Sequence, residues 1–166
     1  MSSPASSKPP RTKFRHVLDA ADPPRIHALV TAAGVFSAEE ARVAAELAET
    51  TLDGSETYRW LIAEQDEELV GYTCFDRIPF SKLSFDLYWI AVSPELRGSG
   101  LAAELMQRTA TFVRGKRGTQ IFAETSSREP YAAARAFYAK AGFDEIARFE
   151  DFYDAGDDKI VYRLKL

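Results

Sequence analysis

The stretch "ELRGSGLAAEL", from Glu95 to Leu105, decides how this chain is interpreted. Gly98 and Gly100 lie beside an arginine and lead directly into a segment with helical character, although glycine normally weakens a helix. The free N–H groups at a helix N-terminus attract anions, and glycine lets the backbone come close to them. The stretch therefore predicts an anion-binding loop, and the remaining question is which anion it binds.

The composition limits the answer. The chain has 166 residues, of which 46% are hydrophobic, and this suits a single domain with a real core. Its net charge of −4 argues against general binding to nucleic acid or to a membrane surface. Cys74 is the one cysteine, so no internal disulfide can form, and no apolar run approaches the roughly 20 residues of a membrane span. With no signal-peptide pattern either, we expect a cytoplasmic protein.

The order of the expected elements defines a fold class. Residues 1–12 are expected to be a disordered tail and residues 13–166 one domain. A short strand is followed by two helices, at 22–34 and 37–54, where Asp22 is the expected N-cap of the first helix, and Ser37 with Glu40 forms a capping box on the second. Three strands, the glycine stretch with its helix, a strand, a helix and two strands complete the chain. The order β-αα-βββ-α-β-α-ββ predicts an α+β fold around a mixed sheet of about seven strands.

The two glycines are also compatible with two other interpretations, a connection that binds no ligand and a loop that binds a dinucleotide. They could make only a tight strand-to-helix connection. Gly98-x-Gly100-x-x-Ala103 also fits the dinucleotide-binding fingerprint, and Glu124 lies at the distance where that motif places an acidic residue. However, five residues separate the strand from Gly98, and too few βα units follow for a doubly wound fold.

Two motifs carry a resemblance to a known family. Arg97-x-x-Gly100-x-Ala102, between a strand and a helix, resembles the [Q/R]-x-x-G-x-[G/A] motif of the GNAT superfamily, the acetyl-CoA-dependent N-acyltransferases. The stretch 131–143, "YAAARAFYAKAGF", is similar to that family's second signature, N-x-x-A-x-x-F-Y-x-x-x-G-[FY]. The resemblance covers roughly residues 13–166, with the elements in the same order, and it implies a single GNAT-like domain.

The resemblance implies where acetyl-CoA, or coenzyme A, would bind. Its pyrophosphate would lie on the glycine loop and helix start, and its pantetheine arm on the preceding strand and the second signature. The residues implied for the loop are Arg97, Gly98, Ser99, Gly100, Leu101 and Ala102, and those for the arm are Ile90, Ala91, Val92, Tyr131, Ala134 and Phe137. Tyr131 replaces the family's asparagine, which puts one contact with the arm in doubt.

Catalytic roles follow from the same resemblance. Tyr138 corresponds to the family's proton donor to the departing thiolate, although it could instead be a packed helix tyrosine. Asp86, on the strand before the glycine loop, and Glu124, at the end of the next strand, are alternative general bases. A water chain with no single base is a third arrangement. The acidic segment 149–159 could attract a cationic acceptor, but an Asp/Gly cluster between strands is more typical of a turn.

The predicted function is transfer of an acetyl or short acyl group from CoA to an amine of a small molecule or peptide, by direct attack. A non-catalytic acyl-CoA sensor and a nucleotide-dependent oxidoreductase are the alternatives. No metal is expected, because His16 and His27 lack ligand spacing with other residues. Many relatives form homodimers through sheet edges or C-terminal strands, so a homodimer is compatible with the resemblance.

Overall fold

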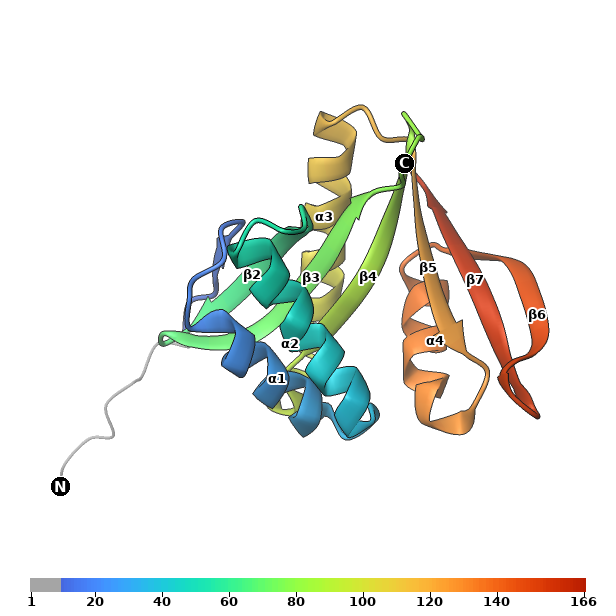
Figure 1. The fold of residues 1–166 in the computed structure, drawn as a ribbon, viewed down its shortest axis with the longest axis horizontal. Coiled ribbons are helices and arrows are strands. Elements are labelled where there is room, and N and C mark those ends of the chain that lie inside the picture. Colours follow the sequence, from blue (N-terminus) through green and yellow to red (C-terminus); the bar gives the residue numbers. More distant parts are fainter. Residues whose placement is uncertain (1–9) are drawn as a thin grey trace, which may run out of the picture.

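The computed structural model describes residues 10–166, so most of the expected tail at 1–12 lies outside the described residues. The element order matches the expected one (Figure 1). The strands are β1 (Lys13–Arg15), β2 (Arg59–Gln65), β3 (Glu68–Arg77), β4 (Ser84–Val92), β5 (Gln120–Ser126), β6 (Asp144–Asp154) and β7 (Asp157–Lys165). The helices are α1 (Asp22–Ala33), α2 (Ala38–Leu52), α3 (Leu101–Gly115) and α4 (Ala132–Lys140), with short 3₁₀ turns η1 (Pro94–Leu96) and η2 (Glu129–Tyr131).

The seven strands form one mixed sheet in the order β1-β2-β3-β4-β5-β7-β6, which confirms the predicted fold class. Neighbouring strands are antiparallel except β4 and β5, which run parallel and are joined through α3. A parallel pair requires such a crossover, whereas the antiparallel pairs β2–β3, β3–β4 and β6–β7 follow each other directly in the chain. Figure 1 shows β4 and β5 diverging from their common start, so that the sheet opens in its middle.

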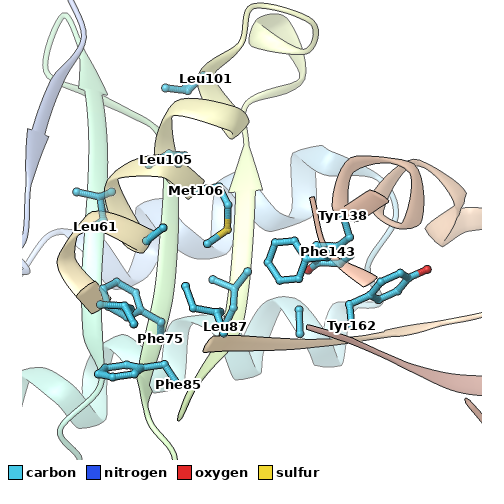
Figure 2. Close-up of a cluster of buried hydrophobic side chains, with 14 of the residues drawn as sticks. Leu61, Phe75, Phe85, Leu87, Leu101, Leu105, Met106, Tyr138, Phe143 and Tyr162 are labelled. Atoms are coloured by element: carbon cyan, nitrogen blue, oxygen red, sulfur yellow. The ribbon is translucent and has the colours of Figure 1, made fainter. Parts of the chain in front are cut away.

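Two hydrophobic cores cover the two faces of the sheet. One contains α3 and the C-terminal half, including Leu105, Tyr138 and Tyr162 (Figure 2). The other packs α1 and α2 against β2 to β4, and it contains the buried Cys74. Burial raises the pKa of the Cys74 thiol well above its ordinary value, and Cys74 serves as a small core residue.

A bulge in β4 changes which of its side chains face which core. Cys74 pairs with Trp89 while Phe75 pairs with Leu87, so Tyr88 is an extra residue on β4. Side chains normally alternate between faces, so positions 85, 87, 89 and 91 would all face one core in a regular strand. Instead Leu87 lies in the core with α3, whereas Ala91 lies in the core with α1 and α2.

Of the two expected N-terminal caps, the one on α2 is confirmed and the one on α1 is wrong. The Ser37 hydroxyl accepts a hydrogen bond from the Glu40 N–H, and the Glu40 carboxylate accepts one from the Ser37 N–H, which is the predicted capping box. Asp22 is not the N-cap of α1, because Ala21 occupies that position. Asp22 is instead fully buried and accepts two hydrogen bonds of 2.7 Å from the Arg15 guanidinium. A buried carboxylate requires such a partner.

Candidate functional site

The opening between β4 and β5 defines the candidate site. The two strands pair only from Ser84–Gln120 to Asp86–Phe122. Beyond Asp86, β4 remains paired with β3 up to Val92, but its other edge has no strand partner among residues 10–166. Alternate residues of an antiparallel pair direct their backbone polar groups away from the partner strand, so groups within the segment Ile90–Val92 face an unpaired edge inside the sheet. An extended ligand can bond to such an edge as a strand would.

A pocket of about 520 Å³ fills this opening. Its walls come from the α1–α2 connection, β4, β5, η2, α4 and the β6–β7 hairpin. Of the expected site residues, the lining includes Ile90, Ala91, Val92, Arg97, Ala102, Glu124, Tyr131, Ala134, Phe137 and Tyr138. Such a volume, mostly apolar with a few polar groups, is typical of a small-molecule site.

The glycine loop lies at one end of the pocket and offers free backbone donors. Gly98 and Gly100 have φ values of 77° and 87°, a left-handed conformation that explains why both are glycine. Within residues 10–166, the N–H groups of Gly98, Gly100, Ala102 and Ala103 have no acceptor, while the Leu101 N–H bonds weakly to the Ser99 hydroxyl. Four free donors at the start of α3 are the feature that an anion-binding loop requires, and the binding itself remains a prediction.

Arg97 holds this loop against α1. Its guanidinium donates a 2.7 Å hydrogen bond to the carbonyl of Ala33, at the C-terminal end of that helix. A cation is favoured there because helix C-termini carry partial negative charge. Arg97 lines the pocket, whereas Gly98, Ser99, Gly100 and Leu101 do not. The side chain thus positions the loop as well as contributing positive charge to it.

Tyr138 is 7% exposed and lies on α4, where it contacts Phe143 and Tyr162 at ring distances of 5.2 and 5.3 Å (Figure 2). Its hydroxyl forms no hydrogen bond to the described residues, yet Tyr138 lines the pocket. Burial raises the pKa of the phenol, with a smaller contribution from Tyr162. The phenol therefore stays protonated at neutral pH with its proton free to donate.

The two candidate bases occupy different places. Asp86 lies at the point where β4 and β5 separate and does not line the pocket; burial, then repulsion by Glu124, raises its pKa, while Lys159 partly opposes this shift. Glu124 lines the pocket, but its carboxylate forms a 3.1 Å ion pair with Lys159 and its side chain is 52% exposed. Of the two, only Glu124 can touch a molecule in the pocket.

Tyr131 lies in η2, and its side chain contacts residues of the opposite side of the pocket. Its hydroxyl donates hydrogen bonds of 2.9 and 3.2 Å to the Glu40 carboxylate of α2, and its ring meets Phe36 edge-on at 6.1 Å. Burial and the bond to Glu40 raise the pKa of Tyr131 to about 12. The tyrosine at this position therefore connects the α1–α2 side of the pocket to the α4 side.

We expect Tyr131→Phe to lower the free energy of unfolding by about 1 kcal/mol, since hydrogen bonds to charged groups contribute about 1.5–3 kcal/mol and this one is partly exposed. Urea denaturation followed by circular dichroism measures the change. Tyr58→Phe is the matched control, because the Tyr58 hydroxyl has no hydrogen-bond partner within the described part of the chain. Equal stabilities of the two variants would show that the contact with Glu40 contributes nothing.

Sequence reasoning missed part of the pocket wall. The further lining residues on its acceptor side are Glu40, Tyr88, Thr125, Ser126 and Arg128. Tyr153 and Asp157 also line it, and they belong to the acidic segment 149–159, for which attraction of a cationic acceptor is one of two interpretations. The sequence explains Glu40 through its capping box and Asp157 through its place in an Asp/Gly turn. The turn is real, at Ala155–Gly156, but Asp157 begins β7 beside Ser126 and faces the pocket. No local pattern reveals this, because Ser126 and Asp157 are 31 residues apart.

Two negative findings complete the geometry. No helix within residues 10–166 has the length and apolarity needed to cross a bilayer. The same residues contain no group of three or more His, Cys, Asp or Glu side chains that could hold a metal ion.

Comparison with known proteins identifies the family. The family model described as "Acetyltransferase (GNAT) family" matches residues 24–143, well over half of the chain. A solved GNAT-family acetyltransferase from Desulfovibrio desulfuricans is 39% identical, covers 93% of this chain and 99% of its own, and superposes with a TM-score of 0.91. The chain therefore belongs to the GNAT family of acetyltransferases.

More distant structures agree in fold. The ribosomal-protein-S18-alanine N-acetyltransferase from Escherichia coli is 19% identical, with a TM-score of 0.71 over 93% of this chain and 94% of its own. An acetyltransferase from Salmonella typhimurium, solved with acetyl-CoA, is 18% identical, with a TM-score of 0.69 over 94% of each chain. A search of curated proteins found no match.

Proposed function

We propose that this protein transfers an acetyl or short acyl group from CoA to a primary amine of a small molecule or peptide. The observation that carries the proposal is the unpaired edge of β4 leading to the free amides of the glycine loop. The edge suits the amide-containing pantetheine arm, and the loop suits the pyrophosphate. Acetyl-CoA is bound in related structures, among them the one from Salmonella typhimurium.

The thioester would lie where the opening passes Tyr138. Ala134 and Phe137, within the first two turns of α4, line the same wall and would pack against the arm. The acceptor would enter from the side formed by Phe36, Glu124 and Tyr153. Both substrates would then be held in one pocket, and this arrangement favours direct attack without a covalent enzyme intermediate.

The chemistry requires little from the protein besides positioning and proton transfer. The amine nitrogen attacks the thioester carbonyl, a C–N bond forms, the C–S bond breaks, and the nitrogen releases one N–H proton to solvent. Tyr138 would donate its proton to the departing thiolate sulfur, and solvent would restore that proton. The raised pKa of Tyr138 keeps it a donor across the neutral range.

The test is incubation of the purified protein with acetyl-CoA and a panel of primary amines, with thiol release and product mass as readouts. We expect thiol release that depends on the amine and an acetylated product of matching mass. Tight CoA binding by calorimetry without thiol release from any amine would favour the alternative, an acyl-CoA-binding sensor. Binding of NAD without binding of CoA would contradict both.

A further inference from the structure

Three carboxylates line the acceptor side of the pocket, and each comes from a different element. They are Glu40 of α2, Glu124 of β5 and Asp157 of β7. All three act on the Tyr153 hydroxyl, whose pKa is raised by burial first and then by these charges. Because all three groups line the same pocket, they can act on one bound molecule.

The three carboxylates differ in their hydrogen-bond donors and in whether they form an ion pair. Glu40 accepts hydrogen bonds from the Tyr131 hydroxyl and the Ser37 N–H. Glu124 is paired with Lys159. Asp157 accepts one bond, on its Oδ1 atom, from the Ser126 hydroxyl, and over residues 10–166 it forms no ion pair. Its Oδ2 atom remains free to accept.

Asp157 is also the most buried of the three, with 7% exposure. A desolvated carboxylate without a counter-ion is costly, and the cost falls sharply when a cation binds it. Its position is fixed from both sides: Ser126 bonds to it, and the neighbouring Asp158 N–H bonds to the Ser127 hydroxyl at 2.8 Å. A fixed, buried and uncompensated anion that faces a pocket is suited to a cationic group of a ligand.

We infer that Asp157 binds the ammonium group of the acceptor and accepts its proton before attack. This inference rests on the proposed transferase function and names the charge state of its acceptor. In the step, an N–H bond of the ammonium breaks and an O–H bond forms on Asp157 Oδ2. The neutral amine then attacks the thioester, and Asp157 later returns the proton to solvent. Ser126 is a positioning residue, because it acts by orienting this carboxylate.

The pocket walls suggest the rest of the acceptor. The pocket is lined by the aromatic side chains of Phe36, Trp89 and Tyr153. The ring centroids of Phe36 and Trp89 are 5.0 Å apart. Aromatic faces next to a carboxylate suit an ammonium that carries an apolar or aromatic body. The probe pair is therefore 2-phenylethylamine, a cation at neutral pH, and 2-phenylethanol, its neutral analogue of nearly the same shape.

The experiment measures binding of both probes to the CoA-loaded protein by calorimetry. We expect the wild-type protein to bind 2-phenylethylamine about tenfold or more tightly than the alcohol, because only the ammonium group donates a charged hydrogen bond to Asp157. Asp157→Asn keeps the shape and the contact with Ser126. It should remove this preference while leaving alcohol binding unchanged. Amine-dependent turnover should also fall by about 10²-fold or more.

Controls separate the inference from a structural effect. Glu150→Gln removes one charge from the same hairpin, at an exposed residue outside the pocket, and should bind both probes like the wild type. The melting temperature of Asp157→Asn should be equal to or above that of the wild type, since an uncompensated buried charge is lost. A lowered melting temperature with an unchanged probe preference would mean that Asp157 is only structural, which overturns the inference.

Two further outcomes are decisive. The absence of an ammonium preference in the wild-type protein, or equal preference in Asp157→Asn, overturns the inference. An ammonium preference that depends on Asp157, found together with no thiol release from any amine, confirms the binding site but contradicts the transferase function. The two proposals can therefore fail separately.

Discussion

Tyr138→Phe is expected to lower kcat by about 10²–10⁴-fold, the usual range for loss of a positioned proton donor. The substitution keeps the ring and its contacts with Phe143 and Tyr162, and it removes a hydroxyl with no hydrogen-bond partner among residues 10–166. CoA affinity and thermal stability should therefore change little. Steady-state thiol release, calorimetry with CoA and a thermal melt measure the three quantities.

The pH dependence provides a second check on Tyr138. Because burial raises the pKa of its phenol, the group stays protonated as the pH rises through the neutral and mildly alkaline range. Wild-type kcat should therefore show no loss of activity from this group up to about pH 10, the ordinary pKa of tyrosine. Near-native turnover by Tyr138→Phe would mean that solvent protonates the thiolate. A large loss of stability would mean that the hydroxyl has a structural role.

Gly100→Glu should weaken CoA binding by on the order of 100-fold, since it places a negative charge beside the proposed pyrophosphate site and opposes its charged hydrogen bonds. Nothing lies within 4 Å of a Cβ atom built on Gly100, so the first side-chain atom of the variant meets no neighbour. Its φ of 87° still makes any side chain unfavourable, by about 1–2 kcal/mol.

Gly100→Gln is the matched control, because it has the same shape and the same backbone strain without the charge. We expect the glutamine variant to lose the same stability as the glutamate variant but much less CoA affinity, with thermal melts and calorimetry as the two measurements. Equal affinities of the two variants would show that strain alone acts. An unchanged affinity in Gly100→Glu would show that the phosphates bind elsewhere.

The features predicted correctly are those encoded by neighbouring residues. The capping box of Ser37 and Glu40 requires a spacing of three. The four free amides of the glycine loop and helix start follow from two glycines before a helix. Tyr138 is predicted from its register within a single helix, and it does line the pocket. Its catalytic role remains a prediction.

The features that were missed depend on pairing between distant segments. The sequence predicts a cap at Asp22 because two prolines follow it, but its partner is Arg15 on a strand. The family resemblance implies a bulge in the strand before the glycine loop, but its position at Tyr88 is visible only in the register with β3. Asp157 meets Ser126 because β7 pairs with β5, a register that two separate apolar strands do not specify. In addition, aspartate is common beside glycine in turns, so its presence at position 157 does not by itself indicate a place in the pocket.

The edges of the sheet have a bearing on aggregation. An unpaired strand edge is a template for pairing with other chains. At the outer borders, β1 is only three residues long and carries Lys13 and Arg15, while β6 is interrupted by two register shifts. The free edge of β4 instead lies inside the sheet, between α4 and the α1–α2 connection. Other parts of the fold therefore flank this edge, which makes it less accessible to a neighbouring chain than an outer edge of the sheet would be.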